Sequence, residues 1–159
     1  MIIGRSIDLH TKGRGDTLDI TGQIALILRE SQLKDGIASV FVTGSTAGVT
    51  TIEFEPNLVQ DFREAWEDIA PEGVVYHHDK TWGDANGYAH VRASLLGPSL
   101  VVPFKDGELM LGTWQQIVVV DFDNRARESR LLYRLWESRW FPEVIISNPA
   151  AIALDALTL

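Results

Sequence analysis

"LVVPFKDGELML", residues 100–111, decides the fold class, because it predicts two strands joined by a tight reversal. The apolar runs on either side of Asp106 and Gly107 have the length of short strands. An Asp-Gly pair accepts the positive φ angles of a two-residue type I′ turn, which joins antiparallel neighbours. The segment therefore predicts a β-hairpin.

Short apolar or alternating runs predict strands along most of the chain. A polar connection, "NRARES" (124–129), separates the last two predicted strands. The predicted strands outside the hairpin are "SIDLHT" (6–11), "DTLDI" (16–20), "IASVFVT" (37–43), "VTTIEFE" (49–55), "GVVYHH" (73–78), "QQIVVVDFD" (115–123) and "RLLYRLWE" (130–137).

Three helices are predicted between these strands. The first is "GQIALILRESQL" (22–33), with Thr21 as its N-cap and Gly36 closing it. The clearest is "PNLVQDFREAWEDIAP" (56–71), because its large apolar residues recur every three or four positions and so share one face. The third is short, "AHVRASLL" (89–96).

Many hairpin-linked strands with few helices predict an α+β fold of mainly antiparallel β-sheets, packed in a sandwich-like core with about three helices. No linker, repeat or low-complexity run divides the chain. We predict a single domain over residues 1–138 and a C-terminal extension over residues 139–159. The extension is apolar enough to cover a surface.

Composition narrows the class of protein. The chain has 159 residues, of which 45% are hydrophobic, which is enough for one domain with a core. Its net charge of −8 argues against nucleic acid as a partner, since duplex binding depends on a basic face. It has no cysteine, no secretory signal and no apolar run long enough to span a membrane. These features predict a cytoplasmic protein with no membrane partner.

"YHHDKTWGDANGYAH", residues 76–90, gathers three of the four histidines of the chain, two aspartates and an asparagine. Histidine can shuttle a proton or bind a metal while a carboxylate orients its ring. The start of the helix that follows favours an anion. We predict an anion pocket at this helix start, lined by imidazoles and carboxylates of the stretch, with His90 in the first helical turn and Arg92 adding a charge-assisted fork to a phosphate oxygen.

On residue spacing alone, a purely structural role for this stretch is as well supported as a ligand pocket. His78 would then bond a backbone carbonyl, and the acids would solvate a loop. Neighbouring residues of a regular strand face opposite sides, so only one of His77 and His78 can line a pocket. The spacing does not say which.

Two further clusters offer ligand-binding groups. In "GTWQQ" (112–116), Thr113, Trp114 and Gln115 can present an apolar plate and hydrogen-bonding groups to a ring. A core tryptophan at a β-bulge is the favoured alternative. "VTGSTAG" (42–48) lacks the lysine and the spacing of a P-loop, although its hydroxyls at Ser45 and Thr46 can donate hydrogen bonds.

Residues 83–123, "GDANGYAHVRASLLGPSLVVPFKDGELMLGTWQQIVVVDFD", closely resemble the signature of the YjbQ-like family, also called the secondary thiamine-phosphate synthase enzymes. The upstream segments "DIT" and "TAGVTTIE" are also similar, and the resemblance runs from Ile7 to Glu137. It implies an α+β fold and a homotrimer. It also implies a polar pocket formed by His78, Asp84, Asn86 and His90 together with Thr113, Trp114, Gln115 and Glu53.

The resemblance implies a thiamine-phosphate synthase-type transferase, which joins a pyrimidine pyrophosphate to a thiazole phosphate. His78, His90 and Asp84 are then the predicted catalytic residues. A divalent metal ion, Mg²⁺ or Zn²⁺, on His78 or His90 would help pyrophosphate to leave. Trp114 would pack a heterocycle of the small phosphorylated substrate.

One position departs from the family pattern. Gly44 stands where the family usually has a histidine. This departure supports the alternative hypothesis, a non-catalytic module that binds a phosphorylated metabolite or a metal. A third, weaker interpretation is an oligomer whose histidines only join loops at subunit contacts.

Overall fold

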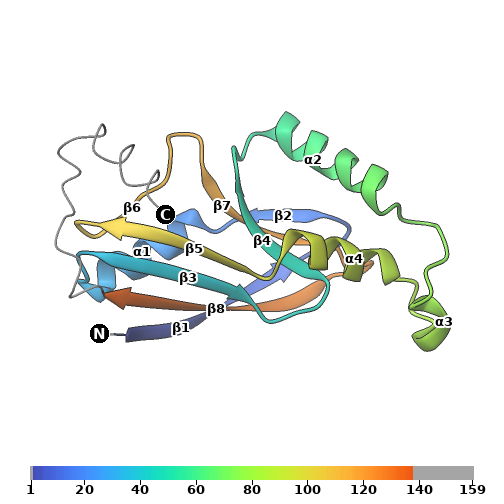
Figure 1. Ribbon diagram of the computed structural model, residues 1–159, viewed down its shortest axis with the longest axis horizontal. Helices are drawn as coiled ribbons and strands as arrows, with labels where there is room; N and C mark the ends of the chain where they lie inside the picture. Colours follow the sequence, from blue (N-terminus) through green and yellow to red (C-terminus); the bar gives the residue numbers. More distant parts are fainter. Residues whose placement is uncertain (1, 138–159) are drawn as a thin grey trace, which may run out of the picture.

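The chain is built around β7 (Gln116–Asp121), in which every residue from Ile117 to Val120 is buried. The computed structural model describes residues 2–137. β7 pairs antiparallel with β2 (Asp16–Asp19) on one side and β4 (Ala47–Ile52) on the other, which makes a three-stranded sheet (Figure 1). Both faces of this small sheet are covered, so β7 is a continuous apolar run and does not alternate.

A second, larger sheet has five strands in the order β1-β8-β3-β5-β6, and all its neighbouring pairs are antiparallel. The predicted hairpin is confirmed, because Lys105 pairs with Glu108 across Asp106 and Gly107, whose φ angles are 54° and 82°. The five strands are β1 (Ile2–Thr11), β8 (Arg127–Glu137), β3 (Gly36–Val42), β5 (Ser99–Lys105) and β6 (Glu108–Leu109).

The core has two compartments, one on each face of the small sheet. On one face, Val49, Ile117 and Val119 pack with α1 (Thr21–Ser31) and the inner face of the large sheet. On the other face, Val118 and Val120 pack against α2 (Pro56–Ile69) and α4 (Gly87–Leu96). The small sheet and α1 lie against the inner face of the large sheet, and α2 and α4 cover the other face of the small sheet (Figure 1). The predicted α+β fold with mainly antiparallel sheets is confirmed.

The segment "GVVYHH" is not a strand, so that prediction is wrong. Gly73 has a φ of 88°, and Val75 beyond it is 80% exposed. The segment pairs with no strand among residues 2–137. It connects α2 to α3 (Asp79–Trp82), a one-turn helix that raises the number of helices in the described part to four. His77 and His78 therefore do not alternate across a sheet.

Three predicted boundaries also move. The N-cap of α1 is Ile20, and Thr21 is the first helical residue, whose hydroxyl and amide both donate to Asp19. The helix ends at Ser31, since Gln32 adopts a left-handed conformation and Gly36 opens β3. β8 begins at Arg127, within the predicted polar connection. The predicted extension over residues 139–159 lies outside the described residues.

Candidate ligand-binding site

A hollow of about 390 Å³ opens at the end of the molecule where β4 and β8 begin and α3 and α4 meet. Its volume is in the range of small-molecule sites. The loop from β3 to β4 forms one wall, and the two helices form another. The hollow is lined by Thr43, Gly44, Ser45, Thr46, Ala47, His78, Trp82, Asp84, Asn86, His90, Arg127 and Glu128.

Two imidazole rings meet in this hollow. His78 precedes the first residue of α3 and already has helical φ and ψ angles, while His90 lies in the first turns of α4. Their ring centroids are 4.3 Å apart, and the ring planes are tilted by 50°. Nε2 of His78 lies 3.9 Å from an Asp84 carboxylate oxygen, which is within ion-pair range but beyond hydrogen-bond distance. His77, by contrast, is exposed and does not line the hollow.

Asp84 is held by two asparagines. With its amide nitrogen turned toward Asp84, Asn86 donates to the two carboxylate oxygens at 3.1 Å and 3.3 Å. The side chain of Asn124 donates to the Asp84 carbonyl at 2.7 Å. Asn86 is itself buried at the start of α4. The short loop between the helices is therefore fixed relative to His90, and Asp84 projects from a constrained backbone.

Asp79 ties the histidine loop to α4. Its carboxylate accepts hydrogen bonds from the N–H of Tyr76 at 2.9 Å and of Gly87 at 3.0 Å. The Tyr76 amide makes the largest contribution, outweighing the cost of desolvation, and with Gly87 it lowers the pKa of Asp79 below its ordinary value. A carboxylate of the chain itself thus occupies part of the N-terminus of α4, where the sequence predicted an anion. A bound anion must find other donors.

Arg127 supplies a cation that the sequence interpretation missed. Its Nε and Nη2 atoms both lie 2.6 Å from one oxygen of the fully buried Asp123, which leaves Nη1 outside this pair. The Thr46 hydroxyl donates to the same oxygen at 3.4 Å. Asp123 therefore holds Arg127 at the hollow. Oε1 of the neighbouring Glu128 lies 3.7 Å from Nδ1 of His10.

A second buried acid, Asp121, lies behind this pair. It accepts hydrogen bonds from the Thr11 hydroxyl and from the Asp123 amide. Burial is the largest influence and, together with the nearby Asp123 charge, raises the pKa of Asp121 above the ordinary aspartate value, although the two hydrogen bonds oppose the change.

Arg92 lies outside the hollow. Its side chain is only 2% exposed, and it donates to the Glu67 carboxylate at 2.7 Å and to the Ala70 carbonyl at 2.8 Å. Its guanidinium also lies over the ring of Tyr88, 4.9 Å from the centroid. It joins α4 to the end of α2, and a role in phosphate binding stays a prediction that this position does not favour.

The "TWQ" element and Glu53 lie at the opposite end of β4. Ala47 opens the strand at the hollow, whereas Thr51 near its far end accepts a hydrogen bond from the Gln115 side chain at 3.4 Å. A six-residue strand is about 17 Å long. Thr113, Trp114, Gln115 and Glu53 are exposed there and do not line the hollow of their own chain.

Sequence reasoning named six candidate site residues that line the hollow, in two separate clusters: His78, Asp84, Asn86 and His90 in one, and Ser45 and Thr46 in the other. It missed Trp82 and Arg127. Trp82 had a usable signal, since it sits inside the histidine stretch. Arg127 had none, because only the pairing of β8 with β1 and β3 brings it close.

The predicted metal finds no ready set of ligands. Within residues 2–137, no group of three or more histidine, cysteine, aspartate or glutamate side chains is arranged to hold a metal ion. His78, His90 and Asp84 do not form one, and protein metal sites of this ligand type need at least three. A metal ion at the hollow would need further ligands from a bound molecule.

Paired imidazoles, a fixed carboxylate and an arginine line a small hollow on an α+β scaffold. A sequence model of the family described as UPF0047 protein YjbQ-like matches residues 5–138. The chain therefore belongs to the YjbQ/UPF0047 family.

Relatives support this assignment. A UPF0047 protein of Archaeoglobus fulgidus is 38% identical over 117 residues, covering 74% of this chain and 89% of the relative. The UPF0047 protein YugU of Bacillus subtilis is 30% identical over 121 residues, covering 75% of this chain and 89% of YugU.

Solved structures have the same fold. A hypothetical protein from Aeropyrum pernix K1 aligns with a TM-score of 0.80 at 31% identity, covering 86% of this chain and 99% of that one. A YbjQ-like protein of unknown function from Sulfolobus solfataricus P2 aligns with a TM-score of 0.78 at 28% identity, covering 87% and 100%. Among residues 2–137, none of the helices has the length and apolar character needed to cross a bilayer.

Proposed function

We propose that the hollow binds a small phosphorylated molecule and that the chain catalyses group transfer of the thiamine-phosphate synthase type. One observation carries the proposal: two imidazoles and a carboxylate from residues 78–90 converge on one hollow with an arginine from the start of β8. Hydroxyl groups from the β3–β4 loop add neutral donors. This combination suits an anion whose charge grows as a bond breaks.

Each group has a distinct part in the proposed reaction. The leaving pyrophosphate gains negative charge as its carbon–oxygen bond breaks and the thiazole nitrogen bonds to that carbon. Nη1 of Arg127 and the hydroxyl of Ser45 would stabilise this charge, and Thr46 would join them by turning its hydroxyl from Asp123 to the ligand. His78, which lies beside Asp84, or His90 would give the pyrophosphate a proton. A divalent cation, Mg²⁺ or Zn²⁺, is also proposed, and phosphate oxygens of the ligand would have to complete its coordination.

A second candidate is a binding module without turnover. It is favoured by the position of Trp114, which lies at the far end of β4 from the hollow and so does not pack a heterocycle bound there. It is also favoured by Gly44, which lines the hollow where the family usually has a histidine. In this reading the same donors hold a phosphorylated metabolite and no bond is broken.

Incubation of the purified protein with both phosphorylated precursors separates these functions. We expect thiamine phosphate above background, and we expect His90→Ala to lower the rate by about 10²-fold or more, as loss of an acid–base group does. His77→Ala is the matched control, because that histidine is exposed and lies outside the hollow. Its rate should equal that of the wild type.

The other outcomes discriminate as clearly. Product that survives His90→Ala would come from a contaminant. Absence of product, with pyrophosphate binding that is lost in His90→Ala, would establish the module. If neither product nor binding is detected, the proposed function is wrong.

We also propose a cytoplasmic homotrimer, as the family resemblance implies. Support comes from the outer face of the large sheet, which carries a row of exposed apolar side chains on neighbouring strands. We call this row the apolar face. It consists of Ile37, Phe41, Val101, Leu132 and Trp136.

A further inference from the structure

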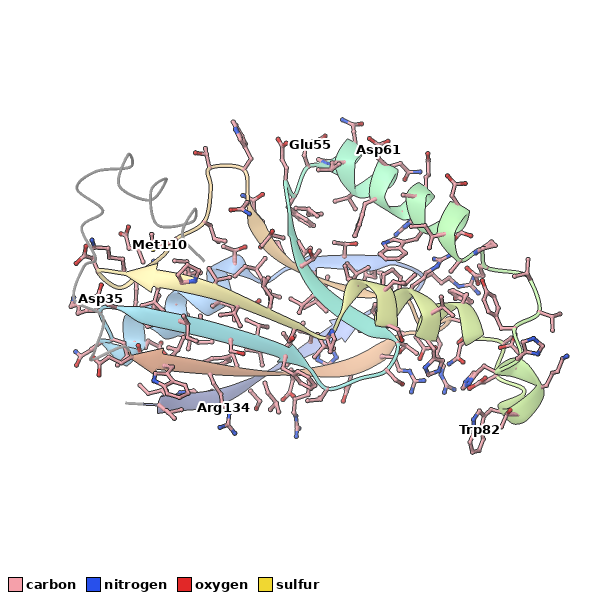
Figure 2. The ribbon with its side chains drawn as sticks, viewed as in Figure 1. Asp35, Glu55, Asp61, Trp82, Met110 and Arg134 are labelled. Carbon is pink, nitrogen blue, oxygen red and sulfur yellow. The ribbon has the colours of Figure 1, made fainter. Side chains whose placement is uncertain are left out.

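Trp82 is an aromatic side chain at the hollow that no step described above uses. It is the last residue of α3, it lines the hollow, and it is 72% exposed. Figure 2 shows it at the far tip of the molecule, below α3. Gly83 follows in a left-handed conformation with a φ of 71° and turns the chain back toward α4. The indole is therefore carried to the rim of the hollow by a short, constrained segment.

Trp82 is far more exposed than Trp66, a tryptophan of the core. Trp66 is buried, and its ring packs edge-on against Phe62 and Phe122 at centroid distances of 5.6 Å and 5.0 Å. In the part of the chain that the structure describes, no other ring packs on Trp82. A large flat apolar surface is thus left open beside polar groups, which is the composition of sites that bind ring-bearing ligands.

The position of Trp82 relative to the histidines gives this surface a direction. Trp82 lies four residues after His78 in one helical turn. The backbone N–H of Trp82 donates to the His78 carbonyl, with a nitrogen–oxygen distance of 3.4 Å. Residues four apart lie on the same side of a helix. The indole therefore lies on the same side of α3 as the imidazole that contacts His90.

We propose that Trp82 is the stacking surface for an aromatic or heteroaromatic ring, and that the ligand of the hollow is an aromatic phosphate ester. This inference rests on the proposed phosphate binding and adds the residue that holds the ring of the ligand. The phosphate would lie against Arg127 and the histidines, and the ring would lie on the indole. The stacking role predicted for Trp114 thus passes to Trp82.

Calorimetric titration with methyl phosphate and phenyl phosphate tests the inference, since the two probes share the charged group and differ in the ring. Wild-type protein should bind phenyl phosphate about 10-fold more tightly, equal to about 1.4 kcal/mol. Trp82→Ala should reduce that ratio to about one while methyl phosphate binding is retained. Trp82→Phe should keep most of the preference, because a flat ring remains.

Trp114→Ala is the matched control. Trp114 is 69% exposed, close to the exposure of Trp82, but it does not line the hollow. The preference for phenyl phosphate should be unchanged in this variant, and circular dichroism should show that each variant is folded.

Four results would overturn the inference. Equal affinity for the two esters in the wild type, or a preference that survives Trp82→Ala, removes the stacking role and leaves the proposed phosphate binding intact. An equal loss in Trp114→Ala would assign stacking elsewhere. If neither ester nor inorganic phosphate binds, the proposed function fails and this inference fails with it.

Discussion

Asp121 is a wholly buried carboxyl group at the end of β7, and its neighbourhood favours the protonated form. Burial is the main cause, and the adjacent Asp123 charge adds to it. Because its folded pKa is raised, the folded state retains the Asp121 proton to a higher pH than the unfolded state does. The corresponding stability is present below the ordinary aspartate pKa and is lost as the pH rises through the folded value.

Asp121→Asn should remove this pH dependence. The amide can accept from the Asp123 N–H and donate to the Thr11 hydroxyl, so both present partners are kept. We expect the unfolding free energy of the variant, relative to wild type, to increase as the pH rises from below the ordinary aspartate pKa toward neutrality. Urea unfolding at a series of pH values measures this difference. A difference that is constant with pH would show that the pKa of Asp121 is not raised.

The histidines show how far single residues could be predicted. Asp84, Asn86 and His90 lie within seven residues of one another, so their proximity follows from the sequence. The choice between His77 and His78 does not, because it depends on whether the segment pairs with a sheet edge. It forms a turn instead, and His78 faces the hollow.

At the scale of elements, the site depends on the contact between the histidine loop and the start of α4. Gly87 is buried there, and its N–H bonds to Asp79. A Cβ atom on Gly87 would lie 2.4 Å from Cβ of Tyr76, closer than packed atoms allow. The loop and the helix can approach only because this residue has no side chain.

Gly87→Ala should therefore separate the loop from α4. We expect a loss of about 1–3 kcal/mol in unfolding free energy, as overpacking produces, together with weaker phosphate binding. Gly22→Ala is the matched control, because its Cβ would meet nothing within 4 Å. It should be neutral or stabilising by up to about 1 kcal/mol. Urea unfolding and calorimetry measure both variants, and equal behaviour would show that the loop is not packed as described.

The elements themselves were predicted with uneven success. The hairpin at Asp106 and Gly107 and the apolar strand β7 follow from local composition, because turn geometry and burial on both faces leave clear patterns. "GVVYHH" had a strand-like composition but no partner strand. Composition records the preference of a segment, whereas a strand also needs an open edge beside it.

At the scale of the whole molecule, the apolar face is a surface of the large sheet that the proposed ligand binding does not explain. Phe41 pairs with Leu132 and Ile37 pairs with Trp136, so these side chains lie next to one another across β3 and β8. Exposed contiguous apolar patches mark interaction sites. Its position on the outer face of the large sheet leaves it open to contact with other copies of the chain.

Val101→Glu should dissociate the proposed trimer, because it places a charge in the apolar face at a side chain that is 54% exposed. Wild-type protein should have three times the mass of the chain in light scattering after size-exclusion chromatography. Ile69→Glu, at a 58% exposed position of α2 away from this face, should leave the mass unchanged. A wild-type monomer, or a trimer that survives Val101→Glu, would contradict the assignment of this face.

The sequence by itself determined the fold class and the loop that carries His78, Asp84, Asn86 and His90, because turn chemistry, hydrophobic periodicity and short separation along the chain are local properties. Only the tertiary structure decided that Arg127 and Trp82 join this loop, and that Arg92 and the "TWQ" element do not. The physical reason is that antiparallel pairing brings together residues far apart in sequence. A strand of six residues also separates residues that a motif had grouped together.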